Sequence, residues 1–126
     1  MVKEGYLFTK EHEWAKVDGD IATIGITEYA QEELGEITYV EMPEIDKDVK
    51  QNDEITVIES SKAASDLFSP VTGKITKVNT ELETNPELIN DDCYGKGWIC
   101  KIELTDKDSL SNLMNTKDYE EYLKEL

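Results

Sequence analysis

Arginine is absent from this chain of 126 residues, so all 13 of its basic side chains are lysines. Without a guanidinium group the chain has no bidentate clamp for a carboxylate or a phosphate. Its 29 acidic residues give a net charge of -16, which argues against nucleic-acid binding because phosphates need a positive field. This charge favours a carrier that meets basic partner surfaces, or simply a highly soluble protein.

Histidine and cysteine are scarce. The single histidine is His12, and the two cysteines, Cys93 and Cys100, form no Cys-x-x-Cys pair. This composition argues against a zinc or iron–sulfur site, and a catalytic triad would have to be built on His12 alone. Gly95-Lys96-Gly97 is too short for a phosphate-binding loop. The composition therefore offers no ready metal, phosphate or triad site.

Long hydrophobic runs are missing as well. No apolar stretch approaches the length of a membrane span, and residues 1–5 carry neither a signal region nor a basic amphipathic presequence. We expect a cytoplasmic protein, or a mitochondrial-matrix one if the chain is a processed organellar form. The length predicts one domain over residues 1–126, and we expect a monomer because each strong apolar run has a use inside the fold.

What the chain does contain is period-two alternation of apolar and polar residues, which predicts a mainly β fold. A helix is expected over 28–34, capped by Thr27 and closed by Gly35. From Thr105 the pattern is helical, so we expect a β core over about 7–104 and a C-terminal helical segment over about 105–126. Strands are expected over 7–9, 12–17, 21–26, 36–42, 54–70 in two runs, 74–78 and 97–104. Loops are expected over 44–53 and 79–92.

The pattern Gly-x-Ile-Thr-x-Val occurs twice, at 35–40 and 73–78. Each copy leads through a polar connection into a strand that ends in Ile-Glu, at Ile58-Glu59 and at Ile102-Glu103. Two similar β-units in one small domain predict a quasi-twofold sandwich in which each unit buries the apolar face of the other.

Lys62 lies between the two runs of the 54–70 stretch, the second of which is stopped by Pro70. We therefore expect Lys62 at or near the tip of a tight hairpin. The residues beside it are small, so nothing bulky shields its amine: Ser60, Ser61, Ala63, Ala64 and Ser65. Most lysines are only solvated surface charges, but this setting indicates a modification site.

Residues 58–73 resemble the lipoyl-lysine hairpin of the glycine cleavage H-protein family, which typically reads Glu-Ser-Val-Lys-Ala-Ala-Ser-Asp, an aromatic, Ser-Pro and a Gly. Here Ser61 replaces the usual Val, and Asp46 stands where the family usually has Gly. The resemblance extends over nearly the whole chain. Its further landmarks are His12-Glu13-Trp14, the block from Gly25 to Gly35, the block from Asn85 to Asn90, and Tyr94-Gly95-x-Gly97-Trp98.

The resemblance implies a lipoyl/biotinyl-type barrel-sandwich hybrid with lipoate in amide linkage to Lys62. It implies a carrier, not itself an enzyme, that takes an aminomethyl group from a PLP-dependent glycine decarboxylase (P protein) to a tetrahydrofolate-dependent aminomethyltransferase (T protein). Dihydrolipoyl dehydrogenase (L protein) would reoxidise the arm, and a lipoate ligase or lipoyl transferase would attach it. By the same resemblance Glu59 helps that enzyme recognise the site, and Glu13 faces the cavity that shelters the loaded arm.

Three alternatives remain open at this stage. A biotin carrier would share the fold, although its lysine usually lies between two methionines rather than between Ser61 and Ala63. An H-like protein could serve mainly as a lipoyl donor in lipoate relay. An unmodified acidic interaction module would carry nothing on Lys62. The aromatic landmarks Trp14, Tyr29 and Trp98 are expected to serve packing rather than ligand binding.

Overall fold

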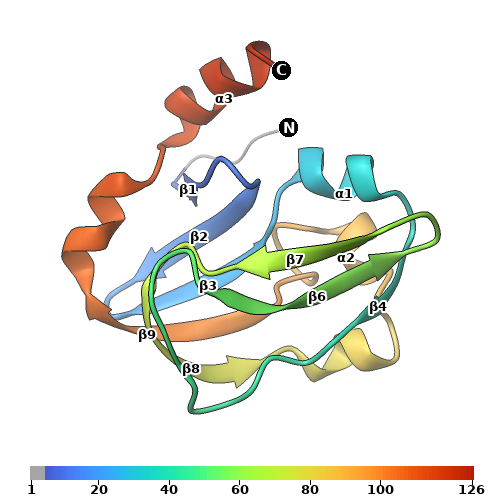
Figure 1. Ribbon diagram of the computed structural model, residues 1–126, viewed down its shortest axis with the longest axis horizontal. Coiled ribbons are helices and arrows are strands. Elements are labelled where there is room, and N and C mark those ends of the chain that lie inside the picture. The colour runs from blue at the N-terminus through green and yellow to red at the C-terminus, as the bar shows by residue number, and fades with distance from the viewer. Residues whose placement is uncertain (1–4) are drawn as a thin grey trace.

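The computed structural model describes residues 5–126 as two antiparallel β-sheets that face each other, with short helices at their edges (Figure 1). The larger sheet has six strands in the order β1 (Leu7–Phe8), β2 (Glu13–Asp18), β3 (Ile21–Ile26), β9 (Cys100–Asp106), β8 (Thr72–Val78) and β5 (Asp48–Val49). The smaller sheet has the order β4 (Ile37–Val40), β6 (Glu54–Ser60) and β7 (Ala64–Phe68). The predicted mainly β fold is confirmed.

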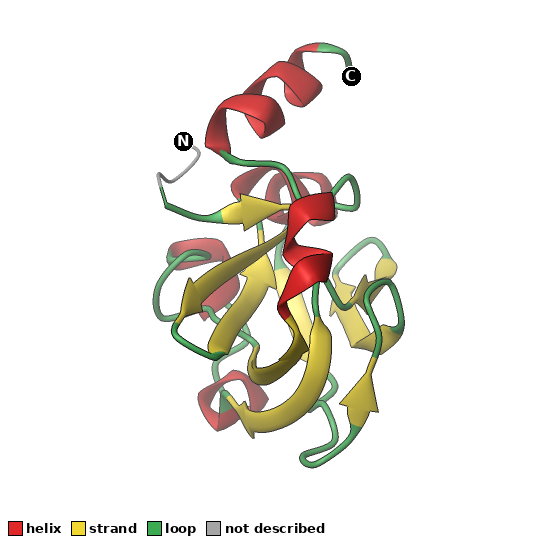
Figure 2. Cartoon of the chain, turned by 90° about the vertical axis from the view of Figure 1, so that its left-hand side faces the viewer, coloured by secondary structure: helices red, strands yellow, loops and turns green. Residues whose placement is uncertain are grey.

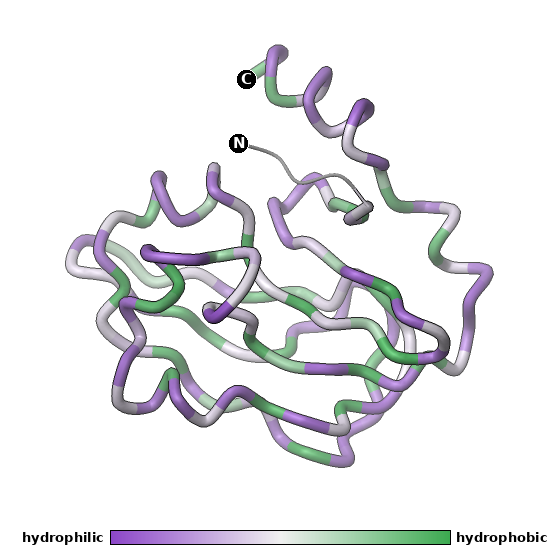
Figure 3. The backbone as a smooth tube through the Cα atoms, turned by 180° about the vertical axis from the view of Figure 1, so that it is seen from behind, coloured by the Kyte–Doolittle hydropathy of each residue, from purple (hydrophilic) through white to green (hydrophobic). Residues whose placement is uncertain are grey.

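The helical segments are short. They are α1 (Glu28–Leu34), a 3-10 turn at Thr80–Glu83, α2 (Leu88–Asp91), a second 3-10 segment at Lys107–Asn112, and α3 (Thr116–Lys124). None of the helices in the described part of the chain is long and apolar enough to cross a membrane. Along the strands, apolar and polar residues alternate, as the tube in Figure 3 shows.

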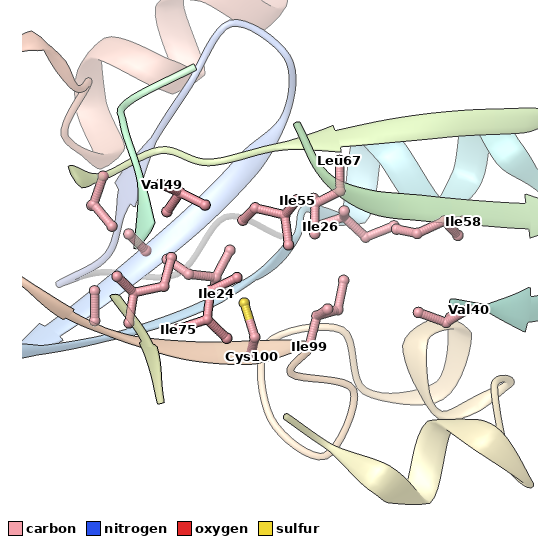
Figure 4. Close-up of a cluster of buried hydrophobic side chains, with 14 of the residues drawn as sticks. Ile24, Ile26, Val40, Val49, Ile55, Ile58, Leu67, Ile75, Ile99 and Cys100 are labelled. Atoms are coloured by element: carbon pink, nitrogen blue, oxygen red, sulfur yellow. The ribbon is translucent and has the colours of Figure 1, made fainter. Parts of the chain in front are cut away.

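The main core lies between the two sheets (Figure 4). Ile58 and Leu67 of the small sheet point toward Ile24, Ile75 and Cys100 of the large one, and each of these side chains is at most 2% exposed. Burying an aliphatic side chain of this size stabilises the fold by about 1.5–3 kcal/mol. The small sheet therefore has one face that is fixed against the core and another that faces solvent.

A second, aromatic cluster attaches the C-terminal helix, which stands apart from the sheets in Figure 2. Tyr119 of α3 is fully buried and stacks on Phe8 of β1, with ring centroids 4.5 Å apart. Its hydroxyl bonds to His12 Nδ1 at 2.8 Å and to Thr27 Oγ1 at 2.9 Å. One tyrosine thus connects α3, the turn before β2 and the cap of α1.

The internal repeat is visible in the strand pairing. In the first copy β4 pairs with β6, in the second β8 pairs with β9, and each pair contains a β-bulge at the threonine of the repeat. The Thr38 hydroxyl donates to the Glu59 carbonyl at 3.3 Å, and the Thr76 hydroxyl donates to the Lys101 carbonyl at 3.4 Å. The two copies lie in different sheets across the core, as a quasi-twofold sandwich requires.

The register of the two copies corrects one detail of the sequence alignment. Tyr39 pairs with Glu59, and its equivalent Lys77 pairs with Lys101. Glu59 therefore corresponds to Lys101, two residues before the Glu103 that the Ile-Glu pattern indicated. The shared Ile-Glu dipeptide shows only that the residue types match. The bulge determines which residues pair across the two strands.

Some element boundaries match the prediction and others differ from it. Helix α1 has the predicted bounds, the Thr27 hydroxyl caps it by accepting from Ala30 N, and Gly35 ends it at φ 81°. Strand β9 begins at Cys100 rather than at 97, because 93–97 form turns. The expected loop over 44–53 contains β5, and the expected loop over 79–92 contains the 3-10 turn and α2. These short elements depend on tertiary pairing, which local pattern does not report.

Asp46 lies in the left-handed region at φ 72°, and its amide donates to the Ile75 carbonyl at 2.7 Å. A residue with a Cβ is strained there, although Asp tolerates this region better than most residues. We expect Asp46→Gly to raise the free energy of unfolding by about 0.5–1 kcal/mol in urea denaturation. Asp48→Gly, in the exposed first position of β5, should lower it instead. A loss of stability in Asp46→Gly would contradict the strain argument.

Candidate functional site

Lys62 lies at the tip of the hairpin formed by β6 and β7, which projects at one end of the molecule (Figure 1). Ser60 N donates to the Ala63 carbonyl at 2.8 Å, and Ala63 N donates back to the Ser60 hydroxyl at 3.1 Å. Ser61 and Lys62 are therefore the two residues at the turn, and both are exposed. The predicted position of Lys62 is confirmed, and its small neighbours leave the amine open to another protein.

A backbone hydrogen bond connects the tip to the body of the domain. Ser61 N donates to the Glu36 carbonyl at 3.0 Å, which ties the turn to the segment that follows α1. Gly35 in that segment lies against the lysine stem: a Cβ added at position 35 would lie 3.3 Å from Lys62 Cε. Any other residue there would meet the lysine and would also be strained at φ 81°.

Asn90 of α2 holds the segment to which the tip is bound. Its side-chain oxygen accepts from Ile37 N at 2.8 Å, and its amide nitrogen donates to the Gly35 carbonyl at 2.9 Å. The same nitrogen donates to Gln31 Oε1 at 2.8 Å. Asn90 belongs to a family landmark, but its role is not visible in the sequence, because no local pattern connects it with a lysine 28 positions earlier.

Glu59 lies on the solvent side of β6, three residues before Lys62. It pairs with Tyr39 of β4 on one side and with Ala64 of β7 on the other, and all three are exposed. The structure thus places Glu59 and Lys62 on the same hairpin. A protein that approaches the lysine can also contact this carboxylate.

Glu13 lies at the base of the same hairpin, at the end opposite the tip. Its side chain is buried, 3% exposed, and accepts from the Thr9 hydroxyl at 2.6 Å and from Phe68 N at 3.1 Å. Burial raises the pKa of Glu13 to about 7, while the bonds from Thr9 and Phe68 favour the ionised form. Glu13 therefore joins β2 to the end of β7, far along the strand from Lys62.

A hollow of about 240 Å³ lies next to Glu13. Thr9, whose hydroxyl bonds to Glu13, is one of the residues that line it. The remaining lining residues are Phe8, Lys10, Glu11, Gln51, Asn52 and 112–114. Glu13 itself lies behind this wall, so the structure brings the carboxylate near the hollow without exposing it there.

His12 precedes Glu13 in the chain and packs among tyrosine rings. Its backbone lies at φ 68°, and its ring is tilted on Tyr29 with centroids 4.3 Å apart. Burial lowers the pKa of His12, although Glu11 and Glu33 oppose this shift. With Nδ1 held by Tyr119, His12 has a packing role, and so has Trp14, which donates from Nε1 to the Cys93 carbonyl at 3.0 Å.

The family model of the glycine cleavage H-protein matches residues 6–126. The chain belongs to this family. It is 48% identical over 125 residues to the glycine cleavage system H protein of Halothermothrix orenii, a match that covers 99% of this chain and 98% of that protein. It is 51% identical over 118 residues to the H protein of Alkaliphilus oremlandii, covering 94% and 92% of the two chains.

A solved structure agrees with the sequence matches. The crystal structure of a glycine cleavage system H protein from Mycobacterium marinum superposes with a TM-score of 0.87 at 30% identity, covering 98% of this chain and 99% of that one. H proteins are the lipoyl carriers of the glycine cleavage system, so the chain is a carrier component of that system. The resemblance seen in the hairpin and the landmarks is confirmed, and the biotin carrier is set aside.

Proposed function

We propose that lipoate is attached in amide linkage to Lys62 and that the loaded chain exchanges its cargo with the other glycine cleavage enzymes without catalysing a step itself. The observation that carries this proposal is the hairpin tip, where an exposed amine is framed by small residues and tied to the domain. The group fits this position because it needs only a reachable amine and open space. When bound, lipoate supplies a disulfide that can be opened reductively and carry the aminomethyl group.

The chain's own residues place and shelter the arm. The Ser61–Glu36 bond and the side chain of Asn90 fix the point from which the arm extends. We propose that Glu59 is read by the lipoate ligase or lipoyl transferase, since it is exposed on the hairpin. We propose that Glu13 faces the cavity that receives the loaded arm; this role rests on the family resemblance, because Glu13 is buried and does not line the hollow beside Thr9. A carboxylate there suits a cargo that bears an ammonium group.

The proposed partners are the P, T and L proteins in addition to the lipoylating enzyme. The net charge of -16 supports encounters with their basic surfaces. We propose that residues 1–126 act as one unit, monomeric and cytoplasmic.

The test is the intact mass of the protein produced with lipoate, biotin and a competent lipoate ligase available. We expect a lipoyl-sized increment on the wild type and none on Lys62→Arg, because a guanidinium cannot form the amide. Lys74→Arg, on the exposed face of β8, is the matched control and should keep the increment. An unmodified wild type, or a biotin increment, would refute the assignment. Adding the glycine decarboxylase to the loaded protein then separates glycine cleavage from lipoate relay.

A further inference from the structure

The small sheet has an outer face that points away from the core, so its side chains do not take part in core packing. This outer face consists of Tyr39, Val57, Glu59, Ala64 and Asp66, which are exposed or, for Val57, half-buried. The pairing aligns Tyr39, Glu59 and Ala64 in one row and Val57 and Asp66 in the next. Paired residues of antiparallel strands point to the same side, so these side chains form one continuous surface.

Tyr39 reaches the outer face because of the bulge at Thr38. Ile37 and Val40 are both buried although they are three positions apart, and regular alternation would place them on opposite sides. The extra residue, Thr38, shifts the alternation of side chains by one position. As a result Val40 points into the core and Tyr39 points to solvent. Tyr39 is 50% exposed, and its side chain is one of three large exposed hydrophobic ones in the described part of the chain.

The second copy of the repeat forms the same bulge without an aromatic residue at the equivalent position. There the same bulge, at Thr76, directs Lys77 and Lys101 to the positions that Tyr39 and Glu59 occupy in the first copy. The same backbone arrangement is therefore built with two lysines. The pair of an aromatic residue and a carboxylate occurs only in the copy that carries the Lys62 hairpin.

An enzyme that modifies Lys62 reaches the hairpin from its solvent side. The other face of the hairpin, with Ile58 and Leu67, is buried in the core. A typical interface covers about 800 Å² on each partner, a patch of roughly 16 Å radius. Glu59 lies about 10 Å along the strand from Lys62, so the row of Tyr39 falls inside such a patch centred on the tip.

We propose that the outer face is the docking surface for the enzyme that bonds lipoate to Lys62, with the Tyr39 ring as its anchor. The proposal rests on the lipoylation of Lys62 proposed above. Interface hot spots are enriched in tyrosine, and the Tyr39 ring lies within this patch. Glu59 pairs with Tyr39, Asp66 lies on the same face in β7, and Glu41 follows β4, so the partner surface is expected to be basic around a pocket for a phenol ring.

The test measures initial rates of lipoylation against the concentration of the full-length unmodified chain, with a lipoate ligase, ATP and lipoate. We expect Tyr39→Ala to raise the KM for the chain at least 10-fold with kcat within about 2-fold, because the ring acts in docking and not in the chemistry. The KM of Tyr39→Phe should stay within about 3-fold of the wild-type value. Ile45→Ala is the matched control, since Ile45 is also 50% exposed but lies in the loop between β4 and β5; it should not change the KM.

The possible results distinguish a failure of the docking surface from a failure of lipoylation at Lys62. If the wild type is lipoylated and Tyr39→Ala has an unchanged KM, the docking surface is refuted while lipoylation stands. The same holds if Tyr39→Ala, once loaded, instead shows a raised KM only toward the glycine decarboxylase, because the face would then serve that enzyme. If the wild type gains no lipoyl mass, both proposals fail. Circular dichroism and urea unfolding of Tyr39→Ala ensure that a raised KM is read on a folded chain.

Discussion

Gly73→Ala is expected to lower the free energy of unfolding by about 3 kcal/mol, because β8 approaches β9 too closely at this position for any side chain. A Cβ on Gly73 would lie 2.1 Å from the Glu103 carbonyl oxygen and 2.7 Å from Ile102 Cγ2. The first of these atoms is backbone, so the strands themselves must separate. The change would disturb the ladder between β8 and β9 and the pairing of Gly73 with Val49 of β5.

Urea denaturation followed by the fluorescence of Trp14 and Trp98 measures this loss. Gly19→Ala is the control, because Gly19 lies at φ 65° in the hairpin between β2 and β3 and nothing lies within 4 Å of its added Cβ. That variant introduces backbone strain without a clash, so it should lower the free energy of unfolding by only about 1 kcal/mol. If both variants lose the same amount, the close contact of β8 with β9 is not what makes Gly73 necessary.

Glu13→Gln should make the protein more stable at pH 8 by about 3 kcal/mol and leave its stability at pH 4.5 nearly unchanged. The pKa of Glu13 is raised from 4.5 to about 7 by burial. Between these values the folded protein keeps a proton that the unfolded chain releases, so the contribution of Glu13 to stability falls as the pH rises from 4.5 to 7. Above 7 the contribution is constant. Like the protonated carboxyl, Gln has one acceptor for Phe68 N and carries no buried charge.

The measurement is the difference in free energy of unfolding between Glu13→Gln and the wild type at a series of pH values. Taking this difference cancels the contributions that the two proteins share. Glu59→Gln is the matched control, since Glu59 is exposed and its replacement should give a difference close to zero throughout. A Glu13→Gln difference that does not change with pH would show that burial of this carboxylate costs nothing to the fold.

Sequence patterns predicted the elements whose signals are local. Helix α1 was predicted from a capping threonine, an acidic first turn and a closing glycine, all within nine residues. The hairpin around Lys62 was predicted from two alternating runs and a proline. In both segments the residues that determine the structure are neighbours in the chain, so the pattern alone was sufficient.

The residues that hold the Lys62 hairpin in place are distant from it in the sequence, so no local pattern predicts them. Asn90 holds Gly35 and Ile37 across 53 or more positions, and its amide looks like any other polar side chain in an acidic stretch. The bulge at Thr38 changes which residues face solvent, but it becomes visible only when the register with β6 is known. Glu13 was singled out by resemblance, whereas its burial and its bond to Phe68 follow from the way β7 meets β2.

The anchoring of the hairpin tip has a consequence for how cargo is delivered. With the turn held by Glu36, and the following segment by Asn90, the mobility of a group on Lys62 comes from its own bonds. An arm of about ten such bonds extends on the order of 12–14 Å, so its end explores a small volume around a fixed pivot. When a partner docks, the effective concentration of the carried group at its active site reaches the millimolar range or above. Within the docked complex, the rate of transfer would then no longer depend on the concentration of the carrier.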